Sequence, residues 1–112
     1  MTCNMPANHQ IIFCTCPDKD TAEKIARLLV VGQKAACVNI LPGITSIYPW
    51  KGQIESAQEH MLLIKAHKSH YQSIETTVRE HHPYELPEII AMPIERGLPE
   101  YLNWIDSCHS SK

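Results

Sequence analysis

Residues 36–67 read ACVNILPGITSIYPWKGQIESAQEHMLLIKAH. The stretch predicts two strands, residues 36–50 and 53–67, joined by a tight turn around Lys51 and Gly52. Pro42 and Gly43 should bend the first strand. Strands of twelve or more residues, at about 3.3 Å per residue, reach about 40 Å, whereas a chain of this length forms a globule about 34 Å across. We therefore expect the tip of this hairpin to extend beyond the rest of the domain.

The residues before the hairpin predict a strand followed by a helix. Residues 11–14 form a short apolar run, which is typical of a strand. Either Asp18 or Asp20 can cap the helix that follows, and Asp20 has Glu23 three residues later. Gly32 is a plausible end for this helix.

The residues after the hairpin predict a helix, a strand and a final helix. Ser69 can cap the first of these, residues 88–93 form the last strand, and residues 99–108 form a short terminal helix. The order of elements is that of an α+β, ferredoxin-like βαββαβ sandwich, with a long central hairpin and a short C-terminal helix.

Composition restricts the chain to a few classes of protein. The 112 residues, 44% of them hydrophobic, suffice for one compact domain, which we place at residues 9–112 after a disordered N-terminus at residues 1–8. No apolar run approaches the roughly 20 residues needed to span a membrane, and the N-terminus lacks the pattern of a signal peptide, so we expect a cytoplasmic protein. The net charge of −2, without a basic stripe, argues against nucleic acid as a partner.

Three predicted strands carry apolar side chains on consecutive residues rather than on alternate ones. They lie at residues 11–13, 61–64 and 89–92. This pattern is typical of strands that are buried on both faces. Helices cover only one face of a ferredoxin-like sheet, so another copy of the chain is the simplest cover for the second face. The alternative is a monomer whose terminal helix buries these runs.

Residues 81–88, HHPYELPE, place two imidazoles and two carboxylates at one chain reversal. Pro83 disfavours the α conformation at His82, so the histidine pair should lie at the end of a helix and be accessible. Such a pair can bind a metal ion or an anion. The alternative interpretation is a polar helix end, where histidine also favours the C-terminal dipole.

The five cysteines are odd in number and, in a reducing cytosol, predict free thiols rather than a disulfide framework. Cys14 is expected on a buried strand, where free cysteine usually behaves as a small hydrophobe. Cys16 should point to the same side and could supply a second thiolate. Cys37 is expected in the core, and Cys3 and Cys108 near the two termini.

Three segments of the chain resemble the CutA (CutA1) family of divalent-cation tolerance proteins. They are residues 14–18 (CTCPD), residues 36–52 (ACVNILPGITSIYPWKG) and residues 81–89 (HHPYELPEI). The resemblance implies a ferredoxin-like fold, a tight homotrimer, a cytoplasmic location and a role in tolerance of copper and other divalent metals. It also implies that copper ligands fall on Cys14, His81 and His82. Cys16 departs from the small apolar residue of many relatives and could alter the metal preference.

We therefore predict a non-enzymatic homotrimer that binds a divalent metal, Cu²⁺ first, with Zn²⁺ or another divalent cation as the alternative. Cys16, Trp50, Tyr84 and Glu88 are further candidates for the metal site or for a subunit interface. His81 and His82 are adjacent, so they can converge on one ion only if the chain is irregular there.

Two other functions stay open from the sequence. The first is a PII-like signalling or scaffold trimer that binds a small anionic effector between subunits, with His81, Lys65, Lys68 and Arg79 as anion partners. The second is a hydrolase with Cys14 as nucleophile and His81 as base, which would require an accessible thiolate of low pKa.

Overall fold

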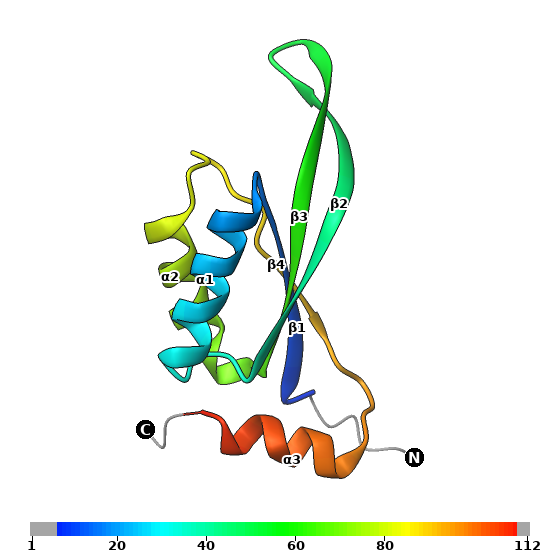
Figure 1. Ribbon diagram of the computed structural model, residues 1–112. Helices are drawn as coiled ribbons and strands as arrows, with labels where there is room; N and C mark the ends of the chain where they lie inside the picture. The colour runs from blue at the N-terminus through cyan, green and yellow to red at the C-terminus, as the bar shows by residue number, and fades with distance from the viewer. Residues whose placement is uncertain (1–6, 110–112) are drawn as a thin grey trace.

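The computed structural model describes residues 7–109 and contains a four-stranded sheet with a layer of helices on one face (Figure 1). Residues 1–6 lie outside this described part. They include Cys3 and most of the N-terminus that the sequence predicts to be disordered, residues 1–8. Within it, no helix is both long enough and apolar enough to cross a membrane. The elements in chain order are β1 (His9–Cys16), α1 (Lys19–Val31), β2 (Cys37–Trp50), β3 (Gln53–His67), the 3-10 turn η1 (Lys68–His70), α2 (Tyr71–His81), β4 (Ile90–Pro93) and α3 (Pro99–Ser107).

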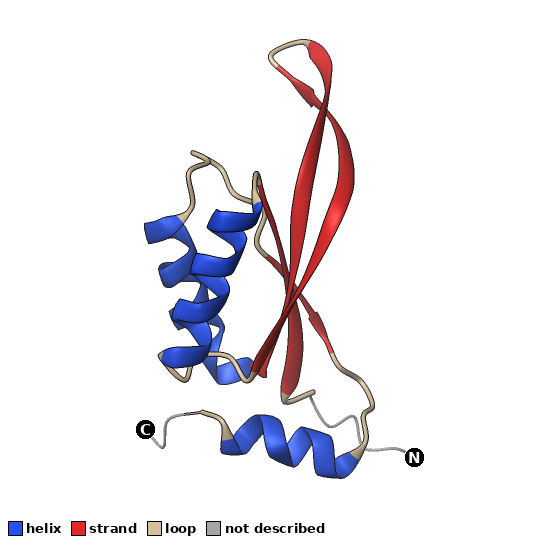
Figure 2. Ribbon diagram, viewed as in Figure 1, coloured by secondary structure: helices blue, strands red, loops and turns tan. Residues whose placement is uncertain are grey.

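The four strands form an antiparallel sheet in the order β2-β3-β1-β4, and α1 and α2 cover one of its faces (Figure 2). Helix α3 lies across the end of the sheet that is opposite the hairpin tip. This arrangement confirms the predicted ferredoxin-like α+β fold with a short C-terminal helix.

The β2–β3 hairpin extends well beyond the helical layer (Figure 1), as its length predicts. The molecule measures 48 × 36 × 22 Å, and its radius of gyration of 15.3 Å exceeds the value near 13 Å expected for a compact domain of about 100 residues. At the tip, Lys51 and Gly52 both have positive φ, 52° and 81°, as a two-residue type I′ turn requires. The register of the two strands shifts between Leu41 and Ile44, which is the irregularity expected from Pro42 and Gly43.

Helix α1 begins and ends as the local sequence predicts. Of the two candidate caps the structure uses Asp18, whose carboxylate accepts a hydrogen bond from the Thr21 backbone N–H at 2.8 Å. That hydrogen bond also lowers the pKa of Asp18. Gly32 is the C-terminal cap residue, and its N–H donates to the Leu28 carbonyl.

Two predicted boundaries are wrong. Ser69 does not cap the second helix, because the chain first makes the turn η1, in which the His67 side chain accepts the Ser69 backbone N–H at 3.1 Å. Helix α2 then continues directly from this turn at Tyr71 without a side-chain cap. The last strand starts at Ile90 rather than at residue 88, because β4 pairs with β1 only through residues 90–93.

The two faces of the sheet differ in what covers them. Ile12, Leu62 and Ile64 face α1 and α2 and are fully buried. On the opposite face, Ile90 and Met92 pair with Phe13 and Ile11 and are 55% and 56% exposed. The described part of one chain thus leaves apolar side chains of the second face in contact with solvent.

A cluster of histidines, which we call the C-terminal histidine cluster, ties the end of the chain to the sheet. It comprises His9, His67, His70 and His109. The His67 backbone N–H donates to Nε2 of His109 at 2.9 Å, and the rings of His70 and His109 stack with centroids 3.9 Å apart. Nε2 of His9 lies 2.9 Å from a carboxylate oxygen of Asp106 in α3.

This cluster should make stability depend on pH. Burial lowers the pKa of His67 and of His70 below the ordinary value of 6.5, while Asp106 partly offsets the shift at His67. Below that value the unfolded chain binds more protons than the folded chain, so stability should fall as pH falls. We expect the urea midpoint to decrease between about pH 7.5 and 5.5.

Replacing His67 and His70 together with glutamine should reduce that decrease, whereas His81→Gln, outside the cluster, should leave it unchanged. Urea unfolding at constant protein concentration, repeated across this pH range, measures the pH dependence of stability for the wild type and for both variants. An equal pH dependence in the wild type and the double variant would contradict the assignment.

Candidate metal centre

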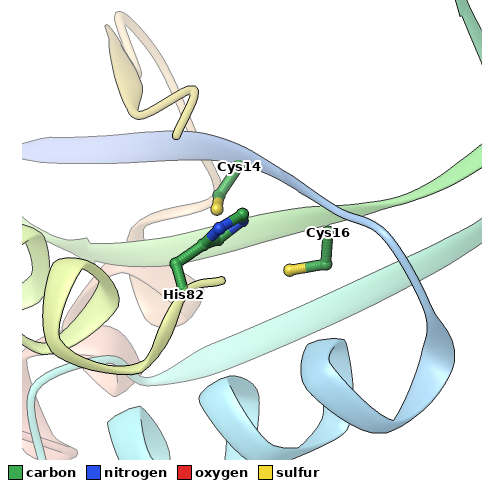
Figure 3. Close-up of side chains that lie close together, drawn as sticks. All are labelled: Cys14, Cys16 and His82. Atoms are coloured by element: carbon green, nitrogen blue, oxygen red, sulfur yellow. The ribbon is translucent and has the colours of Figure 1, made fainter. Parts of the chain in front are cut away.

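Cys14 and Cys16 lie at the end of β1 and point toward the helical layer (Figure 3). This is the arrangement expected for two residues that are two positions apart on a strand. Both side chains are fully buried between the sheet and the helices. The pair is therefore shielded from bulk water and from large reagents.

His82 follows α2 directly, and its imidazole lies beside the two cysteines (Figure 3). Its backbone is extended, as the following Pro83 requires. The expectation of an accessible imidazole is wrong for His82, which is only 8% exposed. Its Nε2–H donates to the carbonyl of Thr15 at 2.8 Å, and its Nδ1 accepts the Tyr84 backbone N–H at 3.1 Å. The hydrogen bond to the Thr15 carbonyl, 67 residues away in sequence, thus holds the His82 side chain in its buried position.

The structure brings together two of the three expected copper ligands and adds Cys16 to them. One donor atom each from Cys14, Cys16 and His82 lies within 4.8 Å of the other two. His81, the last residue of α2, is not part of this group. Adjacent residues at a helix end point in different directions, so only one of the two imidazoles reaches β1.

The two thiols differ in how readily they lose a proton. The hydrogen bond with Cys16, burial and the nearby carboxylates of Glu88 and Glu59 raise the pKa of the Cys14 thiol. The same hydrogen bond lowers the pKa of Cys16, although burial and the negative charge of Asp18 act to raise it. Cys16 is therefore the thiol that ionises first. A buried Cys14 thiol with a raised pKa is a poor nucleophile, which argues against the hydrolase hypothesis.

The donor set fits a soft or borderline metal ion. Thiolate and imidazole are the donors that copper and zinc prefer. Both nitrogens of His82 are, however, already hydrogen-bonded, which fixes its neutral tautomer with the proton on Nε2. To bind a metal through Nδ1, His82 must give up the hydrogen bond from Tyr84.

The remaining candidates, Trp50, Tyr84 and Glu88, line a separate cleft of about 840 Å³ between the hairpin and the segment after α2. Tyr84 donates a hydrogen bond of 2.6 Å to the buried carboxylate of Glu59, and burial together with this bond raises the pKa of Tyr84. Among the described residues that line the cleft, the charged ones are glutamates and none is a lysine or arginine. The anion partners considered for an effector, His81, Lys65, Lys68 and Arg79, do not line it.

Sequence reasoning overlooked two groups beside the cysteines. The first is the Thr15 carbonyl, which holds His82 and carries no side-chain signal. The second is His60, which is directly opposite Cys16 in the β1–β3 register. The strand period offers a signal for His60, because it lies two and four residues before the buried Leu62 and Ile64.

Comparison with known proteins gives one family. The family described as "CutA1 divalent ion tolerance protein" matches residues 10–108 of this chain. Mouse "Protein CutA" is 46% identical over 101 residues, which are 90% of this chain but 57% of the mouse protein. This chain thus spans little more than half the length of that relative. "Divalent-cation tolerance protein CutA" of Yersinia pestis (strain Pestoides F) is 38% identical and is covered over 85% of its length, again with 90% of this chain.

Solved structures agree with the sequence comparison. CutA from Xylella fastidiosa superposes with a TM-score of 0.91 at 47% identity. The superposition covers 93% of this chain and 100% of the Xylella chain. CutA1 from Shewanella sp. SIB1 gives a TM-score of 0.92 at 42% identity, with 96% and 100% covered. A third relative, from Archaeoglobus fulgidus, is described as a periplasmic divalent cation tolerance protein, with a TM-score of 0.87 at 42% identity over 89% of this chain and 97% of its own.

Proposed function

The chain belongs to the CutA1 family of divalent ion tolerance proteins, and we propose that it contributes to metal tolerance by binding a metal ion, copper first, at Cys14, Cys16 and His82. One observation supports this proposal more than any other, namely that donor atoms of these three residues lie within 4.8 Å of one another. Zn²⁺ and other divalent cations are the alternatives to copper. The protein acts by binding rather than by catalysis.

The residues around the cluster would hold the metal in a site that is closed to water. Cys16 loses its proton more readily than Cys14, so it would make the first bond to the metal. Cys14 would release its proton as the second donor, because the metal supplies the positive charge that stabilises a buried thiolate. Strand β1 holds both cysteines on one side, so little backbone ordering is needed on binding.

We also propose that the protein assembles as a homotrimer through the open face of its sheet. The exposed apolar side chains of β4 and the overhanging hairpin support this proposal, because both would be covered by neighbouring copies. A cytoplasmic location stays a prediction from the sequence. An anionic effector in the cleft is disfavoured, since glutamates line it.

Calorimetric titration of the reduced protein with Cu²⁺ and Zn²⁺, under anaerobic conditions, tests the proposed metal site. We expect Cys14→Ser and His82→Gln to weaken binding more than about tenfold, because loss of a ligand should cost at least as much as loss of an outer partner. His81→Gln is the matched control and should change binding little. Protons compete for thiolate and imidazole, so binding should also weaken as pH falls. The proposal would be refuted if the wild type bound neither of these ions and also failed to bind Cu⁺.

A further inference from the structure

His60 lies on the buried side of β3, beside the two cysteines of β1. The register pairs Cys16 directly with His60, and directly paired residues have Cβ atoms about 5 Å apart on the same face of a sheet. That face is the one that Leu62 and Ile64 also occupy, under the helices. A histidine side chain is long enough to span this separation.

One nitrogen of His60 has no partner. Nδ1 is buried and makes no hydrogen bond within residues 7–109. A buried polar nitrogen without a partner destabilises the fold, so its presence beside the two thiols calls for an explanation. A metal ion bound next to Cys16 would provide the missing partner.

His82 differs from His60 in this respect. Both of its nitrogens are engaged, one with the Thr15 carbonyl and the other with the Tyr84 N–H. Binding a metal through His82 therefore requires the loss of a hydrogen bond inside the protein, whereas binding through Nδ1 of His60 requires none. His60 is not among the atoms that lie within 4.8 Å of one another, so its ring must turn toward Cys16 on binding.

We propose that the nitrogen donor of the metal site is His60, and that Cys14, Cys16 and His60 together select monovalent copper. The inference rests on the proposed metal-binding function, replaces His82 with His60 in the ligand set proposed above, and names the oxidation state of the bound copper. His82 is then a positioning residue, which holds the end of β1 through the Thr15 carbonyl.

The choice of monovalent copper follows from the number and softness of the donors. Two thiolates are soft ligands, which favour Cu⁺. Zn²⁺ in a closed site almost always takes four donors, whereas Cys14, Cys16 and His60 supply three. If His82 were to join as a fourth ligand, the set would instead be the tetrahedral one that suits zinc.

The test is an anaerobic titration of the reduced, full-length protein with Cu⁺ against a chromogenic Cu⁺ chelator of known affinity. We expect Cys16→Val and His60→Leu each to lose more than about 100-fold in Cu⁺ affinity, beyond the upper range for an outer partner. Cys37→Val, also on a strand, and His81→Leu are the matched controls and should change it less than about threefold. Circular dichroism and light scattering check that each variant keeps its fold and assembly.

X-ray absorption of the copper-loaded wild type gives a second readout, in which we expect two sulfur neighbours and one nitrogen. Unchanged affinity in His60→Leu, with loss in His82→Gln, would overturn the inference while leaving the proposed function in place. Binding of Zn²⁺ with two sulfur and two nitrogen neighbours, in preference to Cu⁺, would overturn the choice of metal. If the wild type binds no Cu⁺, Cu²⁺ or Zn²⁺, both the inference and the proposed function fail.

Discussion

Aspartate at both Ile90 and Met92 should convert the proposed trimer into monomers of 12.7 kDa. Both side chains lie on the open face of the sheet and are more than half exposed in the single chain. Burying a large apolar side chain in an interface contributes about 1.5–3 kcal/mol, and both residues occur in every subunit. Aspartate removes this contribution and adds carboxylates whose burial without partners is costly.

Light scattering coupled to size-exclusion chromatography measures this change at micromolar concentration. We expect a mass near three chains for the wild type and near one chain for the double variant. Val31→Asp is the control, because Val31 is 80% exposed at the end of α1 and lies on the helical layer rather than on the open face. A variant that remained trimeric would show that another surface carries the assembly, and a monomeric wild type would refute the trimer itself.

His82→Ala should lower the free energy of unfolding by about 3 kcal/mol. The substitution removes both hydrogen bonds of the buried imidazole. The Tyr84 N–H is left without a partner, and the Thr15 carbonyl keeps only the weak hydrogen bond from the Cys14 thiol at 3.8 Å. An unsatisfied buried group costs about 1–3 kcal/mol. The space left by the ring, which contacts Tyr84 with centroids 4.7 Å apart, adds to the loss.

The neighbouring histidine provides the control. His81 makes no side-chain hydrogen bond within residues 7–109, so His81→Ala should change stability by less than about 0.5 kcal/mol. His82→Gln should recover part of the loss, because an amide can donate to Thr15 and accept from Tyr84. Urea unfolding at constant protein concentration measures all three variants, and equal losses for His81→Ala and His82→Ala would contradict the structural role of His82.

Because His82 has this structural role, weaker metal binding in a His82 variant does not by itself identify His82 as a metal ligand. His81 and His82 are adjacent and, from the sequence, equivalent. In the structure, His82 supports the strand that carries both cysteines, so its removal can weaken metal binding without any bond between His82 and the metal. His82→Gln, which retains hydrogen-bonding capacity, is therefore the more informative variant.

Local patterns were enough to predict the framework. The alternating and apolar runs, together with the turn at Lys51 and Gly52, predict the hairpin and strand β3 at the residues where they occur, Gln53–His67. The sequence also predicted the end of α1 at Gly32 and narrowed its start to two candidate caps, Asp18 and Asp20, because caps depend on neighbours within four residues. The period of two likewise places Cys14 and Cys16 on one side of β1.

Contacts between distant segments decided the rest. The burial of His82 depends on the Thr15 carbonyl, the pairing of Cys16 with His60 depends on the strand register, and the C-terminal histidine cluster joins residues from both ends of the domain. The strand period indicates which face of β3 carries His60, but no local pattern identifies the partner in any of these contacts, because such contacts depend on where two segments meet in space. The chain's own sequence was therefore sufficient for its strands, helices and buried face, whereas the identity of the histidine that faces the two thiols emerged only when β1, β3 and the segment after α2 packed together.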